Sequence, residues 1–567
     1  MLLARVVACN FDQTIFDTND LSTIRGSSLI LLRFPESLIQ GLQKAHSDLS
    51  VAKITSGASE LLFRFAARPG ASEAVERYLC AVLRTGERNI DLPLRLFTFV
   101  WAVENGDPSS DGKDFHLRQQ SLVARCNYEQ FRHPTIVIPA FYPDSFRSGE
   151  HKSGVDAKNV VCSIDGIRPS SPSRKQGQKQ FVSDSVSQRK HYGTLARQLF
   201  YDWALKDGDA EKQGAPVDRF ADMFKDMLPD PAESLELSIP ESLTGKMALV
   251  YLDGNSFGKR RDAEAVRGEN KLQAFSEKIT GLRRDLLRHV LDDLKDRDGM
   301  MSPEIQATDT QEARPARLRF ETLLWGGDEV MWVLPAWQAW AFMEVVQRHL
   351  ADSTRWGELK HAAGLLIAPY KTPIRDLTAL VRDLGDAAKR GDGREMNGVQ
   401  VGVITGFDLP GLTVDGWRRP LLSATPAEDE HNTLCATFQM DGGHWGEIRE
   451  RMSAIKDPDT GLPRSSLYRL YHAALRERMS AIKDPDTGLP RSSLYHKALR
   501  DGLFGTSNSM AAKEHLETGI ARIQQLNEKI NDDALKTLRE GFPGASGIDA
   551  HPLSPLYQIL QLWDIAR

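Results

Sequence analysis

A hairpin that decides the fold lies in the stretch Arg317-Leu-Arg-Phe-Glu-Thr-Leu-Leu-Trp-Gly-Gly-Asp-Glu-Val-Met-Trp-Val-Leu-Pro335. Two apolar runs with β character flank the four residues Gly326 to Glu329, a pattern typical of two strands joined by a tight turn. Paired glycines tolerate the positive φ that many such turns require. We therefore expect the turn to present two carboxylates, Asp328 and Glu329, at the tip of the hairpin.

A second apolar run, upstream of the hairpin, also ends in a carboxylate. Lys246 to Leu252 has the pattern of a buried strand, and Asp253 and Gly254 follow it in a glycine-bearing turn. If the two strands are neighbours, three carboxylates converge into an oxygen-rich site of the kind that holds Mg²⁺ while substrate phosphates complete its coordination shell. Taken alone, Gly-Gly-Asp-Glu is more often a polar hairpin tip with a structural role.

Four segments, in the same order along the chain, resemble a known family. They are Leu252-Asp-Gly-Asn-Ser-Phe257, Gly326-Gly-Asp-Glu329, Ala363-Gly-Leu-Leu-Ile-Ala-Pro-Tyr-Lys-Thr-Pro-Ile374 and Asp386-Ala-Ala-Lys389. They are similar to the Asp-Gly-Asp-like turn, the Gly-Gly-Asp-Asp hairpin, the following strand and the Ala-Lys helix end of nucleotide-cyclase palm domains. The chain thus resembles GGDEF-type cyclases and, more closely, the large polymerase-cyclase subunit family of type III CRISPR effector complexes.

The resemblance implies a fold and an activity. The expected fold is α+β, with two ferredoxin-like palm domains of the nucleotide cyclase and polymerase kind plus helical domains. The expected activity is nucleotidyl transfer by two Mg²⁺ or Mn²⁺ ions, which makes a cyclic oligonucleotide second messenger, oligoadenylate from ATP, for antiviral defence. Guide or target RNA and other effector subunits are the expected partners.

The resemblance also assigns roles to single residues. Asp253 and Asp328 are the expected catalytic metal ligands, with Glu329 as a further ligand and Gly254 offering backbone groups. The expected nucleotide-binding residues are Gly254, Asn255, Phe257, Gly326, Gly327, Lys371 and Lys389, with Lys259 in reserve. Lys389 also falls at the end of a predicted helix, where the helix dipole favours a cation in any case, so helix capping and phosphate binding both remain open.

The sequence departs from the family pattern at two acidic positions. Glu329 stands where the CRISPR subunits have a second aspartate, although GGDEF-type cyclases carry glutamate there, and Asn255 replaces the second acid of the turn. No N-terminal histidine-aspartate nuclease domain is recognisable. The rival hypothesis is a non-catalytic large scaffold subunit of an RNA-guided effector complex. A diguanylate-type cyclase is a third possibility, because no feature of the sequence indicates which nucleotide base is recognised.

The N-terminal segment resembles a second palm domain without its acids. Residues 2–9 form an apolar strand, and the strand pair of residues 51–65 occupies the place of the metal hairpin. The tip of that pair is Ser56-Gly-Ala-Ser59, so only Glu60 remains as a carboxylate. We therefore expect a catalytically empty palm, in which Asp12 and Asp17 have structural roles.

Composition places few further limits on function. The hydrophobic share of 41% and the charged share of 26% are those of an ordinary soluble globular protein, and no run of eighteen apolar residues predicts a membrane span. We expect a cytoplasmic protein without a signal peptide. The net charge of −5 gives no global attraction to nucleic acid. Five cysteines without a C-x-x-C pair predict reduced thiols. The segment that begins at Cys162 resembles half of the family's zinc knuckle, with His191 downstream. Zinc is not expected there, because Asp165 replaces the second cysteine.

The length of 567 residues predicts several domains. We expect the empty palm at 1–110, a linking domain at 111–245 with the knuckle-like segment, the catalytic palm at 246–412 and a helical domain at 413–567. The linking domain carries a basic segment, for which a solvated loop and contact with RNA phosphates both remain open. Its cations are Arg174, Lys175, Lys179, Arg189 and Lys190. The helical domain repeats residues 449–468 identically at 476–495, which indicates a recent tandem duplication.

Overall fold

The computed structural model describes residues 1–404 except 10, 58, 87–90, 106–113, 133–160, 171–180, 206–219 and 305–314, and beyond them 437–439, 444–456, 532–540, 545–546 and isolated positions between 517 and 563. The second copy of the duplication and most of the first lie outside the described residues, as do Arg174, Lys175 and Lys179.

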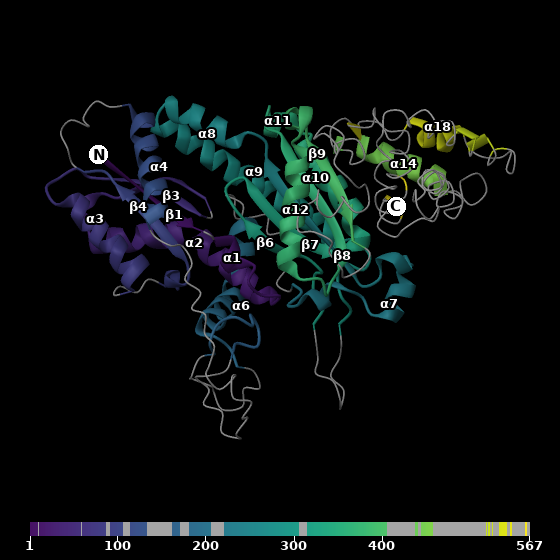
Figure 1. Cartoon of the computed structure of the whole chain (residues 1–567), viewed down its shortest axis with the longest axis horizontal. Helices are drawn as coiled ribbons and strands as arrows, with labels where there is room; N and C mark the ends of the chain where they lie inside the picture. Colours follow the sequence, from purple (N-terminus) through teal and green to yellow (C-terminus); the bar gives the residue numbers. More distant parts are fainter. Residues whose placement is uncertain are drawn as a thin grey trace, which may run out of the picture.

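The N-terminal unit is a four-stranded antiparallel sheet in the order β2-β3-β1-β4. Helix α2 connects β1 to β2, a hairpin joins β2 to β3, and α3 lies between β3 and β4. This is the ferredoxin-like βαββαβ arrangement (Figure 1). The elements are β1 (Leu2–Cys9), α1 (Phe11–Ile15), α2 (Leu21–Ala45), β2 (Ala52–Ser56), β3 (Glu60–Phe65), α3 (Ala71–Cys80), β4 (Thr98–Val103) and α4 (Phe115–Arg132).

The second sheet repeats this topology. Its strand order is β11-β10-β9-β8-β5-β7-β6, in which β8-β5-β7-β6 has the same connectivity as the N-terminal sheet. The prediction of an α+β fold with two ferredoxin-like units is confirmed. The elements are β5 (Lys246–Gly254), α8 (Phe257–Val266), α9 (Glu269–Lys295), β6 (Glu321–Trp325), β7 (Glu329–Pro335), α10 (Ala339–Leu350), α11 (Ser353–Trp356), β8 (His361–Pro369), α12 (Ile374–Ala388), β9 (Gly398–Val403), β10 (Thr437–Gln439) and β11 (Ala545–Ser546).

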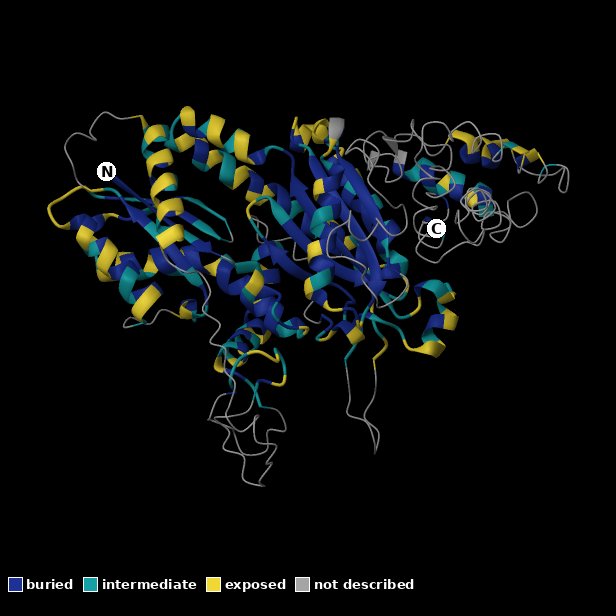
Figure 2. Ribbon diagram, viewed as in Figure 1, coloured by how far each residue is buried: buried dark blue, intermediate teal, exposed yellow. Residues whose placement is uncertain are grey.

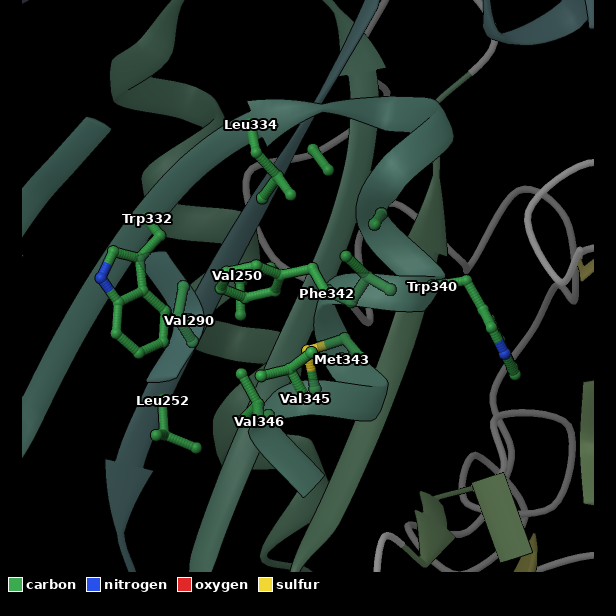
Figure 3. Packing of buried hydrophobic residues seen from close by; sticks show 14 of the residues in the cluster. Val250, Leu252, Val290, Trp332, Leu334, Trp340, Phe342, Met343, Val345 and Val346 are labelled. Atoms are coloured by element: carbon green, nitrogen blue, oxygen red, sulfur yellow. The ribbon is translucent and has the colours of Figure 1, made fainter. Parts of the chain in front are cut away.

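Alternation along β5 divides the core between the two faces of this sheet. Val250 and Leu252 point to the face covered by α9 and α10, where they pack with Trp332, Phe342 and Val290 (Figure 3). The intervening side chains belong to the core on the α12 face; they are Met247, Leu249 and Tyr251. Because side chains alternate along a strand, the next residue of the second set, Asp253, faces the α12 side.

The two units pack against each other in a pseudo-symmetric way. Helix α2 of the first unit lies on β6 of the second, and α9 of the second lies on β2 of the first. Arg25 of α2 forms a buried ion pair with Glu321 of β6, and Arg64 of β3 pairs with Glu269 of α9 at 2.6 Å. The outer faces of α3, α4 and α8 remain exposed, while the strands of both sheets are largely buried (Figure 2).

The linking region contains helix α6 (Asp184–Leu205), which starts inside the segment predicted as loop. Two of the predicted RNA-contacting cations are used within the fold. Arg189 is fully buried and pairs with Asp17 at 3.0 Å, and Lys190 pairs with Asp20 at 2.7 Å. For Arg189 the solvated-loop and RNA-contact interpretations are both wrong, because its side chain is fully buried. Lys190 lies on α6 with 43% of its side chain exposed, so for it the loop interpretation is wrong and RNA contact stays a prediction.

The remaining helices are α7 (Pro231–Glu236), α14 (His444–Lys456) and α18 (Asp532–Glu540). Helices α14 and α18 lie on the side of the second sheet away from the N-terminal unit (Figure 1). Among the helices that the structure describes, none combines the length and apolar character that a membrane crossing requires.

The packing of α12 on β8 predicts a large effect of one added methyl group. A Cβ at Gly364 would lie 2.1 Å from the carbonyl oxygen of Val381, so Gly364→Ala must push α12 off the sheet and should lower the free energy of unfolding by about 1–3 kcal/mol or more. The control is Gly281→Ala on α9, where nothing lies within 4 Å of the new atom. It should raise stability by up to about 1 kcal/mol, because alanine is the better helix former. Urea denaturation measures both variants, and equal effects would contradict this packing.

Candidate active site

Asp253 is the last residue but one of β5, an interior strand of the second sheet, and 9% of its surface is exposed. Its register partner in antiparallel β7 is Glu329. Side chains of register partners point to the same face of a sheet, so the carboxylates of Asp253 and Glu329 share the α12 face. The predicted neighbourhood of the two strands is therefore present.

The predicted hairpin is formed by β6 and β7. The Gly326 amide donates to the Glu329 carbonyl oxygen at 2.7 Å and closes the turn, while the Gly254 amide donates to the Asp328 carbonyl oxygen at 3.3 Å. The second bond brings the backbone of Asp328 beside the end of β5. The expectation of positive φ is wrong for both hairpin glycines, which lie outside the left-handed region. The tip instead meets the tip of the N-terminal hairpin, where a Cβ on Gly57 would lie 3.7 Å from the Cα of Gly327.

Two cations, one within α12 and one at its C-terminus, neutralise part of the negative charge of these carboxylates. The Lys389 ammonium pairs with Asp253 and, at 3.0 Å, with Asp386. The Arg382 guanidinium lies 4.0 Å from Glu329 and pairs with Asp12 of the N-terminal unit at 2.7 Å. Lys389 is the C-cap residue of α12, so it occupies the helix end and also contacts a candidate metal ligand.

The carboxylates also influence one another. Burial raises the pKa of Asp253 above its usual value, against the lowering effect of Lys389, and the charge of Asp328 raises it further. Burial likewise raises the pKa of Glu329, against Arg382, with additional contributions from Asp253 and Asp328. The site is thus a crowded group of carboxylates whose negative charge is only partly balanced by neighbouring cations.

Two of the predicted nucleotide-binding residues are used inside the fold. The Phe257 ring is 4% exposed and lies over Gly254, where a Cβ would come within 2.4 Å of the ring. Asn255 is 3% exposed, and its side-chain amide donates to the carbonyl oxygens of Gly393, Arg394 and Met396 at 3.1–3.2 Å. Phe257 therefore explains the need for glycine at 254, and Asn255 holds the loop before β9.

The structure does not bring Lys371 to the other candidates. It follows β8 at the end where Pro369 pairs with Lys246, whereas Asp253 pairs with Ala362 at the opposite end. Seven residues of antiparallel strand separate the two ends by roughly 24 Å. Lys371 is exposed, and its ammonium lies over the Tyr370 ring at 5.7 Å. Lys259 is also exposed, on α8.

Among its described residues, the N-terminal unit has no equivalent acidic group. Glu60, which occupies the place of Glu329, pairs with Arg5 at 3.1 Å and with Arg261 of α8 at 3.3 Å. Asp12 pairs with Arg382 and Asp17 pairs with Arg189, as expected of structural residues.

The knuckle-like segment is held together by hydrogen bonds. Asp165 accepts from the amides of Ile167 at 2.9 Å and Arg168 at 3.0 Å, and it pairs with the Arg168 guanidinium at 3.0 Å. Arg168 in turn pairs with Asp17 at 2.5 Å. His191 is exposed. The Asp165 carboxylate therefore organises its own turn and the contact with the N-terminal unit.

The donor set of the candidate active site fits a cation that a substrate helps to bind. In the described part of the chain, no group of three or more His, Cys, Asp or Glu side chains could hold a metal ion by itself. Mg²⁺ in nucleotide enzymes characteristically takes one or two carboxylates and completes its shell with waters and phosphates. Asp253 and Asp328 can supply those carboxylates, and the pKa of Asp253, raised by burial and further by the charge of Asp328, marks a place where added positive charge is favourable.

Sequence reasoning missed two residues of this region, Arg283 and Arg382. Arg283 of α9 donates to the Gly326 carbonyl oxygen beneath the hairpin tip. Its position in the apolar stripe of α9, between Leu282 and Leu286, is a signal that a buried charge has a partner. Arg382 gave no comparable signal, because its partner Asp12 is remote in sequence.

Comparisons with known proteins place part of the chain in a family. Residues 246–397 match the family model described as Cas10/Cmr2, second palm domain. A search of curated proteins found no match.

Several solved structures are similar to the chain as a whole. Csm1 in T.onnurineus has a TM-score of 0.47 and 14% identity, covering 99% of this chain and 69% of that one. The apo Csm1-Csm4 cassette has a TM-score of 0.48 and 12% identity, and the cassette in complex with cA4 has 0.46 and 14%; both cover 99% of this chain and 70% of the other.

At these scores the assignment depends on the family match and on the strand order described above. The match covers all of the candidate acidic residues, from Asp253 to Glu329, and extends past Lys389. The predicted resemblance to the large subunits of type III CRISPR complexes is confirmed, because residues 246–397 match the second palm domain of the Cas10/Cmr2 family.

Proposed function

We propose that this protein is a metal-dependent nucleotidyltransferase that joins nucleoside triphosphates, with ATP as the substrate, into a cyclic oligonucleotide. The observation that carries the proposal is the convergence of Asp253 with the Asp328-Glu329 tip at adjacent strand ends of a Cas10-type palm domain. Palm domains of this kind belong to the nucleotidyltransferase class.

Asp253 and Asp328 would hold the divalent cations, Mg²⁺ or Mn²⁺, with Glu329 as a further ligand and the Gly254 backbone beside them. When bound, such cations would activate an attacking ribose 3′-hydroxyl and stabilise the leaving pyrophosphate in an in-line displacement. The small tip residues Gly326 and Gly327 leave room for phosphates to approach the hairpin. In this assignment, the bound cations would balance the carboxylate charge that Lys389 and Arg382 leave uncompensated.

Lys389 binds triphosphate in this proposal. Its ammonium is paired with Asp253. Burial lowers its pKa less than Asp253 and Asp386 together raise it, so it stays charged at neutral pH. A cation that displaces it from Asp253 would free a positive group at the site, where it can neutralise phosphate oxygens.

The proposed product is a cyclic oligoadenylate used as an antiviral second messenger in the cytoplasm. The support is the family of the palm domain and the retained acidic hairpin. Binding of guide or target RNA and assembly with other effector subunits belong to the same proposal. Incubating the full chain with each nucleoside triphosphate and Mg²⁺ or Mn²⁺, with and without RNA, and weighing the products by mass spectrometry tests it.

A scaffold function is the second candidate, and one observation favours it. Carboxylate repulsion would argue against a vestigial acid group, but Lys389 and Arg382 already offset part of that repulsion. The acids could therefore persist without a metal. A scaffold would consume no triphosphate even with its RNA and protein partners present, and the acid-site variants would assemble normally.

The first prediction separates these functions. Asp328→Asn keeps the volume of the side chain but removes its charge, so turnover should fall roughly 10²–10³-fold. Glu329→Gln should have a smaller effect on turnover. The matched control is Glu60→Gln at the equivalent N-terminal hairpin, where two ion pairs are lost. It should cost stability but leave turnover per folded molecule unchanged, and a loss like that of Asp328→Asn would contradict the empty-palm assignment.

The second prediction concerns stability. The pKa of Glu329 is raised in the folded state, so the folded protein binds a proton at this carboxylate more tightly than the unfolded chain does. Ionised Glu329 therefore lowers the free energy of unfolding at neutral pH. Glu329→Gln should therefore stabilise the metal-free protein at neutral pH, by less than about 1 kcal/mol because the carboxylate is partly exposed. The gain should shrink as the pH falls through the raised pKa. Urea titrations in EDTA measure it, and a less stable variant at neutral pH would refute this account of the electrostatics.

The third prediction tests the role of Lys389. Lys389→Met should raise the KM for triphosphate by about tenfold, the usual scale of a lost charged hydrogen bond. It should also tighten Mn²⁺ binding to the nucleotide-free protein, because the ammonium no longer competes for Asp253. Lys371→Met at the other end of the sheet is the control and should change neither quantity. An unchanged KM would leave Lys389 as a helix cap only.

A further inference from the structure

Arg283 is a buried cation in an apolar surrounding. It lies on α9 with 4% of its surface exposed, on the helix face that carries Ile279, Leu282, Leu286 and Leu287. Arginine is rarely buried so completely unless its charge and its donors have partners. The partners of this guanidinium therefore indicate its role.

Its hydrogen bonds go to both ends of the hairpin turn. The same nitrogen, Nη1, donates to the carbonyl oxygen of Gly326 and, at 3.4 Å, to that of Glu329. These two residues also close the turn with the Gly326 amide bond to the Glu329 carbonyl oxygen. The Arg283 side chain, from the long helix α9, thus donates to one residue before Asp328 and to one residue after it.

The charge of Arg283 has no carboxylate bonded to it in the described structure, because both acceptors are carbonyl oxygens. Burial lowers its pKa to about 10, so the guanidinium remains charged at neutral pH. The opposing, favourable influence comes first from Asp328 and then from Asp253 and Glu329. The anions that make its burial tolerable are therefore those of the candidate active site.

Another buried arginine of the same unit shows the contrast. Arg319 is 2% exposed and forms a two-pronged ion pair with Glu233 at 2.8 and 2.6 Å, with a further bond to the Gly299 carbonyl oxygen. That arrangement joins two structural segments and involves no candidate ligand. Arg283 instead donates to backbone carbonyl oxygens of the hairpin tip.

We propose that Arg283 is the positioning residue of the acidic hairpin: it fixes the turn that carries Asp328 and Glu329 from below and supplies a permanent counter-charge while no metal is bound. The inference depends on the proposed function only in that this tip holds the metal ligands. Arginine suits the task because its planar guanidinium fixes the direction of the Nη1 donors, whereas a lysine ammonium at the end of a flexible chain is held less rigidly.

The experiment uses Arg283→Lys in the full chain, because lysine keeps the charge but loses the planar guanidinium that holds the donating nitrogen in place. Hydrogen exchange at residues 325–330 should become at least about tenfold faster than the change in global stability accounts for. Mn²⁺ binding to the nucleotide-free protein, followed by electron paramagnetic resonance, should weaken by about tenfold, in the range seen when groups supporting metal ligands are removed. Since the charge is retained, weaker binding must come from lost geometry. If the protein has turnover, kcat should fall more than KM changes.

The matched control is Arg319→Lys, which should lower global stability without changing hairpin exchange or Mn²⁺ affinity. Wild-type hairpin exchange and Mn²⁺ affinity in a folded Arg283→Lys protein would overturn the proposal. If Arg283→Lys does not fold, Arg283→Gln is measured in the same way. Failure of both variants to fold, while Arg319→Lys folds, would show that Arg283 supports the whole unit and would overturn a local positioning role.

The proposed function fails in a different way. If the wild-type chain binds no Mn²⁺ at this site and consumes no triphosphate, the metal assignment is wrong, whereas faster hairpin exchange in Arg283→Lys would still show that Arg283 holds the tip.

Discussion

The antiparallel register between β5 and β7 is the constraint on which the candidate site depends. Asp253 stands opposite Glu329, and the Gly254 amide bonds to the Asp328 carbonyl oxygen, so three acidic residues from two remote segments lie at neighbouring backbone positions at one end of the strands. A slip of one residue would turn Asp253 toward α9 and α10 and into the apolar core. The alternating core residues Val250 and Leu252 on one face, and Tyr251 on the other, fix this register, so hydrophobic packing places the acids.

The N-terminal unit supports the site without contributing an acidic hairpin. Asn19 accepts a hydrogen bond from the Ile374 amide at 3.0 Å and so caps the start of α12, and Asp12 holds Arg382 in the middle of the same helix. Lys389 at the end of α12 then contacts Asp253. One helix thus connects the empty unit to the candidate ligands. The segment Ile24-Arg-Gly-Ser-Ser28 of α2 is held by close contacts, since Arg25 pairs with Glu321, and a Cβ at Gly26 would lie 1.8 Å from the Arg189 carbonyl oxygen.

Much of the fold could be predicted from sequence because strands and helices here have strong periodic patterns. The strand predicted at 2–9 spans Leu2–Cys9, and the strand predicted to begin at Lys246 spans Lys246–Gly254. The meeting of Asp253 with the hairpin followed from apolar runs that end in acids. Phe257 and Asn255 could not be judged in this way, because a motif does not reveal that a ring is buried or that an amide is already bonded. The prediction for Lys371 was misleading, because its motif spans the whole of β8. Lys371 therefore follows the end of this strand that lies far from Asp253. Arg382 and Asp12 form a contact between remote segments that no local pattern encodes.

The central claim is that Asp253 and Asp328 bind divalent cations together with a triphosphate. The most direct measurement is anomalous X-ray scattering from crystals of the full chain grown with Mn²⁺ and a non-hydrolysable ATP analogue. The account predicts Mn²⁺ between the carboxylates of Asp253 and Asp328, in contact with the phosphates, and the Lys389 ammonium moved from Asp253 to a phosphate oxygen. Nucleotide bound without Mn²⁺ at these carboxylates, with Lys389 still paired to Asp253, would contradict it.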